Sequence, residues 1–185
     1  MCIGDVVGKG MSAAVFMANL QAAVRAFASP RTASMDLCEQ VNRLISKNIA
    51  RGKFITFLYG LVDGKDRRLI YTNAGHNPPI LLRHEGAVMR LDEGGALLAV
   101  FPECKYQEGE VELVSGDRML LFTDGVSEVR DSEEHEFGEE RLIQLLKDSR
   151  ELGTADVQTK VIETITEFSR GNFHDDVTMI AMTVL

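Results

Sequence analysis

The sequence FITFLYGLVDGKDRRLIYTN, residues 54–73, decides the fold class. It contains two runs rich in β-branched and aromatic residues, 54–62 and 68–73, separated by the turn pair Asp63-Gly64. A connection this short cannot hold a crossover helix, so we expect the two runs to pair as antiparallel strands. Further β-rich runs follow at residues 80–83, 88–91, 111–114 and 118–123, most of them after similarly short turn signals. The middle of the chain is therefore predicted to be antiparallel sheet.

Helical patterns lie before and after this predicted sheet. Strong helix formers and apolar residues at helical spacing predict four helices, and a β-rich run predicts a final strand. The helices are expected at residues 12–28, 34–50, 138–147 and 154–169, and the strand at 177–185. Pro30 closes the first helix, and Gly52 is the expected stop of the second. Because no repeat, Pro-rich linker or low-complexity tract interrupts the chain, residues 1–185 are predicted to form a single α+β domain.

Composition and charge exclude several classes of protein. Of the 185 residues, 45% are hydrophobic and 26% are charged, which is the balance of a globular protein with a substantial core rather than a disordered chain. The net charge is −8 and no run of Lys and Arg is present, so nucleic-acid binding is not expected. The chain has no apolar stretch of about 18 residues and no signal-peptide pattern at its start, so no membrane segment is predicted.

The cysteines and one acidic stretch receive ordinary interpretations. Cys2, Cys38 and Cys104 are an odd number at wide spacing, which indicates reduced thiols in a cytoplasmic protein rather than disulfides or a catalytic cysteine. Residues 131–140 contain six carboxylates, but the ligand order of a calcium loop is absent. We therefore expect a solvated loop there. His84, His135 and His174 have no partners at ligand spacing, so surface roles are expected for them.

Three aspartates stand at strand edges, each beside a turn: Asp5, Asp124 and Asp175. The end of a strand holds a side chain in a fixed position. Clustered carboxylates suit hard cations such as Mg²⁺ and Mn²⁺. In a two-metal site an acidified water attacks in line, so no nucleophilic side chain is needed. The chain indeed lacks a Cys-x₅-Arg loop and a Gly-x-Ser-x-Gly elbow. Taken singly, each aspartate also fits an ordinary turn or cap.

Four motifs that follow one another along the chain make the pattern more specific. They are IGDVVGKG at residues 3–10, YTNAGHNPP at 71–79, LFTDGV at 121–126 and HDDVT at 174–178. In this order they closely resemble the stage II sporulation protein E-like branch of the metal-dependent type 2C serine/threonine protein phosphatases. The resemblance covers essentially the whole chain. It implies an antiparallel β-sandwich flanked by helices, in the layer order α-β-β-α, with metal ions at one edge.

The resemblance also implies roles for single residues around two Mn²⁺ or Mg²⁺ ions. Asp5 matches the aspartate that bridges the two ions, and the backbone carbonyl of Val6 matches a ligand of one of them. Asp124 and Asp175 match the ligands of the second ion. Asp176 matches a less committed partner, and its alternative role is to cap or hydrogen-bond the turn.

Three further residues are candidate supporting groups. Gly75 and the pre-proline position of Asn77 give the turn an unusual backbone, so it could direct Asn73 or His76 toward the site. Both side chains fit equally well a structural role, in which they hold the turn through hydrogen bonds to the backbone. Lys9, between two glycines, is suited to contact a substrate phosphate, and a solvated turn lysine is its alternative.

The chain departs from the family pattern in two places. Family members usually carry an upstream strand pair with a Gly-Gly-Asp-x-Tyr-Asp-like motif, whereas here Asp5 lies four residues after Met1. The resemblance therefore implies that the first strands and first acidic motif are missing, which leaves the first metal site incomplete and a strand edge open to homodimer association. Val7 stands where the better-known type 2C phosphatases have a histidine, so we assign no general acid.

The resemblance implies hydrolysis of phosphoserine or phosphothreonine on a small regulatory protein, an anti-sigma factor antagonist in bacterial signalling. It also implies an upstream sensor or regulatory domain. The missing motif suggests a different class as the alternative, an inactive fragment or degenerate domain that binds a partner. Manganese-dependent turnover of an aryl phosphate would separate the two. A metal-dependent hydrolase or lyase acting on nucleotides ranks last, because the chain lacks a purine-pocket signal and a Gly-rich phosphate loop.

Overall fold

The computed structural model describes residues 1–47 and 52–185, which form two compact units. Unit 1 consists of Met1–His76 and Leu91–Glu112, and unit 2 consists of Asn77–Arg90 and Leu113–Leu185. The expectation of one domain over residues 1–185 stays a prediction. Among the described residues, no helix combines the length and the apolar character that crossing a membrane requires.

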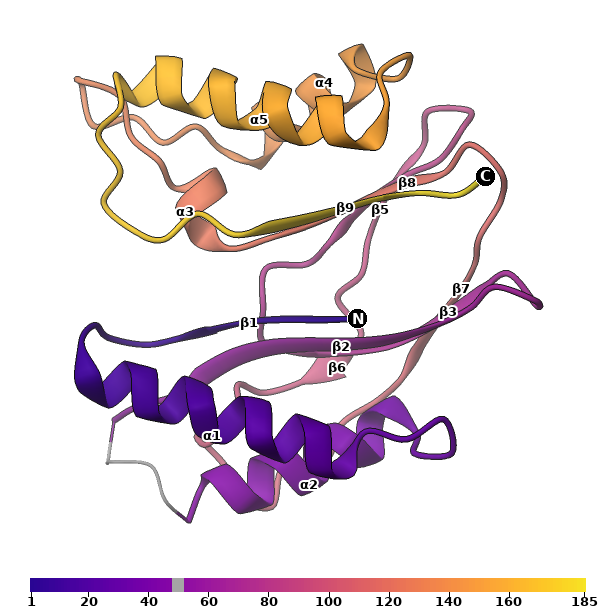
Figure 1. The fold of residues 1–185 in the computed structure, drawn as a ribbon, viewed down its shortest axis with the longest axis vertical. Helices are drawn as coiled ribbons and strands as arrows, with labels where there is room; N and C mark the ends of the chain where they lie inside the picture. Colours follow the sequence, from indigo (N-terminus) through magenta and orange to yellow (C-terminus); the bar gives the residue numbers. More distant parts are fainter. Residues whose placement is uncertain (48–51) are drawn as a thin grey trace. The chain divides into compact units, whose positions relative to one another are not determined.

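Unit 1 is a five-stranded sheet with two helices on one face (Figure 1). Its strands are β1 (Cys2–Val6), β2 (Ile55–Asp63), β3 (Arg68–Ala74), β6 (Gly94–Gly95) and β7 (Gly109–Glu112). All of its ladders are antiparallel except the short pairing of β3 with β6. The β2–β3 hairpin turns at Asp63-Gly64, as the sequence predicts. Strand β6 is not predicted, because two residues are too few to show a periodicity.

The helices of unit 1 are α1 (Met11–Phe27) and α2 (Ser34–Ile45). Helix α2 buries Leu37, Val41 and Ile45 on one stripe, as helical spacing predicts. Its predicted end at residue 50 is wrong for residues 46–47, which form a turn, and residues 48–50 lie outside the described part of the chain. The helix ends where Ser46 donates both its N–H and its hydroxyl to the Asn42 carbonyl, at 2.9 and 2.7 Å.

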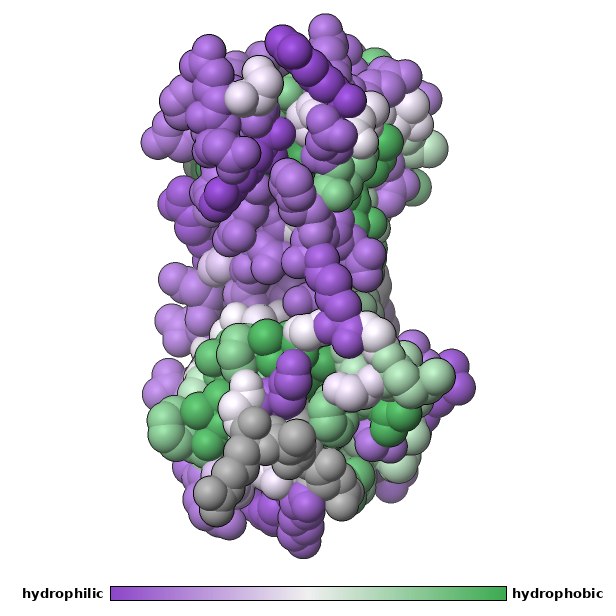
Figure 2. Space-filling model, turned by 90° about the vertical axis from the view of Figure 1, so that its left-hand side faces the viewer, coloured by the Kyte–Doolittle hydropathy of each residue, from purple (hydrophilic) through white to green (hydrophobic). Residues whose placement is uncertain are grey.

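Helix α1 is only partly covered. It buries Leu20 and Ala23 but leaves Met11 and Val15 exposed to solvent. A groove of about 280 Å³ runs along α1 and α2 and is lined mainly by apolar side chains. Figure 2 shows hydrophobic side chains gathered on the face of unit 1 that is turned to the viewer. The alanine-rich sequence of α1 thus gives a helix that packs closely on one side and keeps an apolar outer side.

Unit 2 is a four-stranded antiparallel sheet in the order β5-β4-β8-β9. The strands are β4 (Ile80–Leu82), β5 (Val88–Arg90), β8 (Arg118–Phe122) and β9 (Met179–Thr183). Helices α4 (Glu139–Asp148) and α5 (Thr154–Ser169) cover one face of it (Figure 1). Leu142, Val161 and Ile165 pack there with Leu120 and Phe122 in one buried cluster. The four-residue helix α3 (Asp124–Ser127) is too short to predict from periodicity.

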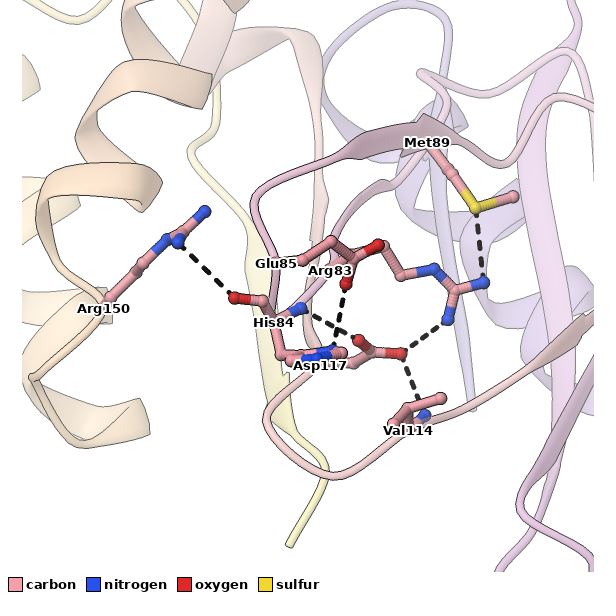
Figure 3. Close-up of polar contacts among 7 residues, drawn as sticks. All are labelled: Arg83, His84, Glu85, Met89, Val114, Asp117 and Arg150. Atoms are coloured by element: carbon pink, nitrogen blue, oxygen red, sulfur yellow. Dashed lines mark hydrogen bonds and ion pairs between the residues drawn. The ribbon is translucent and has the colours of Figure 1, made fainter.

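A buried aspartate fixes the turn that leads into β8 (Figure 3). The carboxylate of Asp117 is fully buried and accepts a hydrogen bond from Arg83 Nη1 at 2.6 Å. It also accepts from the backbone N–H groups of Val114 and His84, at 2.9 and 3.2 Å. Because every one of these groups is a donor, the buried negative charge is balanced on all sides. Asp117 thereby joins the turn before β8 to the β4–β5 hairpin.

Candidate active site

The candidate site of unit 2 lies where β8 ends and β9 begins. Phe122 pairs with Met179, and the N–H of Thr123 donates to the Thr178 carbonyl at 3.0 Å. Because antiparallel neighbours bring the end of one strand beside the start of the next, Asp124 and Asp175 reach the same edge of the sheet. Both line a cleft of about 300 Å³. Two of the three aspartates predicted as metal ligands are thus brought together.

The connection between these two aspartates is held tightly by its neighbours. The buried hydroxyl of Thr123 donates to the Asp176 carbonyl at 3.1 Å and accepts from the N–H of Thr178 at 3.1 Å. A Cβ on Gly125 would press into the Asp176 carbonyl oxygen, so only glycine allows this close approach. The N–H of Asp176 donates to Asp175 Oδ1 at 2.9 Å. Asp176 therefore takes part in the turn through its backbone, and the role of its side chain stays a prediction.

Glu128 is a cleft residue that the sequence analysis missed. It follows Asp124 by one helical turn, and its N–H donates to the Asp124 carbonyl at 2.7 Å. Desolvation raises the pKa of Glu128, and the charges of Asp124, Glu136 and Asp175 raise it further, while Arg130 opposes them. These carboxylates therefore repel one another. Because α3 is too short to predict from periodicity and Glu128 is the residue that follows it, no signal in the sequence places Glu128 at the cleft.

The remaining cleft wall comes from the segment after α3 and from His174. Arg130, Glu134 and His174 line the cleft, although the sequence predicted a solvated loop at residues 131–140 and a surface role for His174. Glu134 and His174 are exposed, as the sequence predicts, and Arg130, for which the sequence makes no prediction, is exposed as well. The segment is not irregular, however, because Arg130 and Glu136 form an antiparallel bridge. A six-carboxylate stretch thus contributes one edge of the site.

The candidate residues Asp5, Val6 and Lys9 belong to unit 1. Asp5 is half-buried on β1, where it stands opposite Thr56 of β2. The side chain of Val6 is buried in the core of unit 1, and Lys9 is exposed on the bend that leads to α1. Their predicted approach to Asp124 and Asp175 joins residues of both units, and it stays a prediction.

Asn73 and His76 hold the turn that carries the second motif. Asn73 is buried, and its amide Nδ2 donates to the carbonyls of His76 and Leu91 at 3.0 and 3.1 Å. Its Oδ1 accepts from the N–H of His76 at 2.7 Å. The ring Nδ1 of His76 lies 2.8 Å from the hydroxyl of Thr56, the residue opposite Asp5. Asn73 thus holds the turn through its side chain, and His76 ties the turn to β2. The supporting role of both residues at the site stays a prediction.

The chemistry of the cleft fits a hard divalent cation. Within each unit, and counting residues 1–47 and 52–185 only, no group of three His, Cys, Asp or Glu side chains is arranged to hold a metal ion. Asp124 and Asp175 nevertheless give two carboxylates to one cleft, and Mg²⁺ is commonly held by one or two carboxylates with water completing its shell. A cation there would also relieve the repulsion felt by Glu128.

Several known proteins are similar to this chain. Phosphoserine phosphatase RsbU of Bacillus subtilis is 26% identical over 98% of this chain and 54% of its own length. The SiaA-PP2C domain of Pseudomonas aeruginosa gives a TM-score of 0.83 at 18% identity, over 98% of this chain and 74% of that one. The catalytic domain of serine/threonine protein phosphatase PstP, solved in complex with two manganese ions, gives 0.71 at 20% identity, over 99% and 86%. This chain spans between 33% and 54% of the length of three curated relatives that it matches.

The similarities agree with the motifs that the sequence analysis singled out. The solved structures show that the fold is that of the type 2C phosphatases, which confirms the predicted α+β class. The family model described as stage II sporulation protein E (SpoIIE) matches residues 1–185, the whole of the sequence. The chain therefore belongs to the stage II sporulation protein E family.

Proposed function

We propose that this chain is a metal-dependent phosphatase that removes phosphate from phosphoserine or phosphothreonine on a regulatory protein. The observation that carries the proposal is the meeting of Asp124 and Asp175 in one cleft, at the edge where β8 ends and β9 begins. The family supports the reaction, and a relative in it is named a phosphoserine phosphatase. The family resemblance supports an anti-sigma factor antagonist as the substrate protein.

Asp124 and Asp175 would hold Mn²⁺ or Mg²⁺, with Asp5 and the Val6 carbonyl as the further ligands that the resemblance implies. The manganese ions of the similar PstP structure support this metal class. When bound, the cations supply Lewis-acid stabilisation of the phosphoryl group and make water a nucleophile at neutral pH. The chain's own part is to place the carboxylates. Thr123 and Gly125 hold the two segments together, so the ligands stand on a rigid edge.

The proposed location is the cytoplasm. Cys2, Cys38 and Cys104 are all free thiols, as expected in a reducing compartment. Burial raises the pKa of Cys38 to about 12, so this thiol stays protonated and unreactive at neutral pH. A nucleophilic role for Cys38 is therefore unsupported.

The test measures phosphate release from a phosphoserine peptide with Mn²⁺, and again after chelation. Asp124→Asn and Asp175→Asn should each lower kcat/KM by about 100-fold or more, because a lost ligand removes several kcal/mol of transition-state stabilisation. Asp148→Asn is the matched control, since Asp148 is exposed on α4 and does not line the cleft. Calorimetric titration of Mn²⁺ gives a second measurement, in which both cleft variants should bind more weakly.

The same data separate phosphatase from binding module. A chain that binds Mn²⁺ but turns over no phosphorylated substrate would support a degenerate domain that acts by binding. Activity that survives both cleft substitutions within about threefold would contradict the assignment of Asp124 and Asp175 as ligands, because losing a ligand costs far more than that.

A further inference from the structure

Arg130 brings a fixed positive charge to a cleft that otherwise carries carboxylates. Asp124, Glu128 and Asp175 line the same cleft as Arg130. A phosphate dianion is repelled by carboxylates and attracted by a guanidinium, whose planar fork can donate two parallel hydrogen bonds to phosphate oxygens. An arginine on the wall of this cleft can therefore attract the phosphate group, which the carboxylates alone would repel.

Arg130 stands on a well-held segment, residues 129–137, which we name the rim hairpin. Arg130 and Glu136 form its antiparallel bridge, and the N–H of Phe137 donates to the Val129 carbonyl at 2.8 Å. Val129 and Phe137 are buried, and the ring of Phe137 packs edge-on against Phe168 of α5. Because its base is anchored in the core of unit 2, the rim hairpin presents Arg130 at a fixed place.

The tip of the rim hairpin is also ordered by local hydrogen bonds. Asp131 Oδ1 accepts from the N–H groups of Glu133 and His135, at 2.8 and 3.0 Å. Desolvation works against ionisation of this carboxyl, but the two backbone donors and the His135 side chain together outweigh it and lower the pKa of Asp131. The Asp131 carboxylate therefore keeps the tip closed at neutral pH.

Two glutamates of the rim hairpin orient the guanidinium of Arg130. Glu136 Oε1 accepts from Nη2 at 2.9 Å, and Glu134 Oε2 accepts from Nη1 at 3.4 Å. The Arg130 side chain is 44% exposed, against 47% for Glu136 and 74% for Glu134. The longer contact thus involves the more exposed carboxylate, and water and salt weaken such a pair further. Of the two, Glu134 is the partner that a ligand can displace at little cost.

We propose that Arg130 binds the phosphate group of the phosphorylated substrate, with Glu136 holding the guanidinium in place and Glu134 giving way to the phosphate. This inference rests on the proposed phosphatase function and adds a substrate-binding residue to it. It also assigns the rim hairpin a role in recognition, because the hairpin that carries Arg130 borders the cleft.

The test compares Arg130→Ala, Arg130→Lys and Glu134→Gln with the parent chain. KM for a phosphoserine peptide and the inhibition constant of inorganic phosphate are measured with Mn²⁺. Arg130→Ala should raise both constants about tenfold, since it removes the charge-assisted hydrogen bonds that the guanidinium donates to the phosphate. Arg130→Lys should recover part of this loss, because it keeps the charge but not the fork. Glu134→Gln should lower both constants about two- to fivefold, because it removes a competitor of the phosphate.

Arg68→Ala is the matched control. Arg68 is 46% exposed and pairs with Glu110 at 2.7 Å and Asp66 at 3.9 Å, yet it lies on β3 of unit 1. This control should leave both constants unchanged. Amide hydrogen exchange of the rim hairpin checks that Arg130→Ala keeps the hairpin closed. Glu136→Gln measures how both constants change when the guanidinium of Arg130 keeps its charge but loses its hydrogen bond to Glu136.

The outcomes are separable. Constants that stay within twofold in Arg130→Ala while the parent chain is active overturn the role of Arg130 and leave the phosphatase standing. Constants that rise in Arg130→Ala only together with loss of hairpin protection, and that Arg130→Lys does not recover, overturn phosphate binding in favour of a structural role. An unchanged or higher KM in Glu134→Gln overturns the proposal that the phosphate displaces Glu134 from Arg130. A parent chain that hydrolyses neither the peptide nor an aryl phosphate overturns the proposed function and this inference with it.

Discussion

The two ends of strand β8 carry aspartates in opposite electrostatic settings. Asp117, just before the strand, is fully buried and receives an arginine and two backbone N–H groups (Figure 3). Asp124, two residues after the strand, is half-buried in a cleft that it shares with Glu128 and Asp175. One strand thus holds an aspartate whose charge the protein neutralises and an aspartate whose charge the protein leaves among like charges.

This difference fits a structural role for Asp117 and the metal-binding role that we propose for Asp124, and we name the two ends of β8 the structural end and the functional end accordingly. A buried ion with donors on every side keeps its neighbours in place, and removing it is costly. Carboxylates that repel one another weaken the fold, and such a cluster is typical of sites where a bound ligand offsets the repulsion. The anchored turn at Asp117 therefore helps to hold the cleft at Asp124 in place, because one five-residue strand in the middle of the sheet of unit 2 connects them.

The largest effect is expected for Asp117→Asn, which should lower the free energy of unfolding by about 3 kcal/mol. The amide cannot accept all three hydrogen bonds, and it removes the carboxylate charge that faces the guanidinium of Arg83, whose side chain is 17% exposed. Urea unfolding followed by far-ultraviolet circular dichroism is the measurement.

Glu110→Gln is the control for this comparison. Glu110 pairs with Arg68 at 2.7 Å, close to the 2.6 Å of the Asp117 pair, but its side chain is 54% exposed. Exposed ion pairs contribute about 0–1 kcal/mol, so the control should be nearly silent. Equal costs for the two substitutions would show that burial of Asp117 does not set its importance.

A smaller loss, about 2 kcal/mol, is expected for Gly125→Ala at the functional end of β8. The new Cβ meets the Asp176 backbone oxygen, which cannot move aside without shifting the connection between Asp175 and β9. Phosphatase activity should fall along with stability. Gly64→Ala is the matched control, since no atom lies within 4 Å of its added Cβ and its φ is not left-handed. If both variants unfold at the same urea concentration, the close approach at Gly125 is not structurally demanding.

The counterpart of Asp117→Asn is Asp124→Asn, and the expected effect on stability has the opposite sign. The metal-free variant should be as stable as the parent or more stable, by up to about 0.5 kcal/mol, because one charge leaves a repulsive group. The same denaturation experiment with a chelator present gives the answer. If Asp124→Asn lowers the free energy of unfolding as much as Asp117→Asn does, Asp124 has a structural role like that of Asp117.

The sequence predicts the elements of this fold well where the pattern is long. Helix α5 begins and ends at the predicted residues, and the β2–β3 hairpin turns where Asp63-Gly64 predicts. Helix α2 is shorter than predicted, because it ends at Ile45 and residues 46–47 form a turn. Elements of two or four residues, such as β6 and α3, depend on tertiary pairing and show no period of their own.

The site is predictable only in part. Asp124 and Asp175 are found from their place beside apolar strands, whereas Asp117 and Asp124 are alike in the sequence and differ only in what the fold packs around them. Arg130 and Glu134 sit in a charged stretch whose composition indicates solvent. Their place at the cleft depends on the rim hairpin, which the buried Val129 and Phe137 anchor. No local rule of sequence predicts that contact.

The smallest effect concerns pH and belongs to the functional end. Desolvation and the charges of Asp124, Glu136 and Asp175 raise the pKa of Glu128 above the ordinary glutamate value of about 4.3. The folded state therefore binds the Glu128 proton more tightly than the unfolded state does. Stability from this source is fully present below the ordinary value and is lost as the pH rises through the raised one. In metal-free protein, Glu128→Gln should remove that loss, so its advantage over the parent grows from acidic to neutral pH.

The double variant Glu128→Gln in the Asp124→Asn background sharpens this test. Removing the Asp124 charge takes away part of the repulsion, so the growth of the advantage with pH should be smaller there, and desolvation should leave a remainder. Added salt should shrink the charge-dependent part and spare that remainder, because mobile ions screen charges but do not restore the water that neighbouring residues displace from part of the exposed Glu128 side chain. If the stability gain from Glu128→Gln grows with pH equally in both backgrounds, the charges of Asp124 and Glu128 do not interact measurably. The contrast between the two ends of β8 would then rest on burial alone.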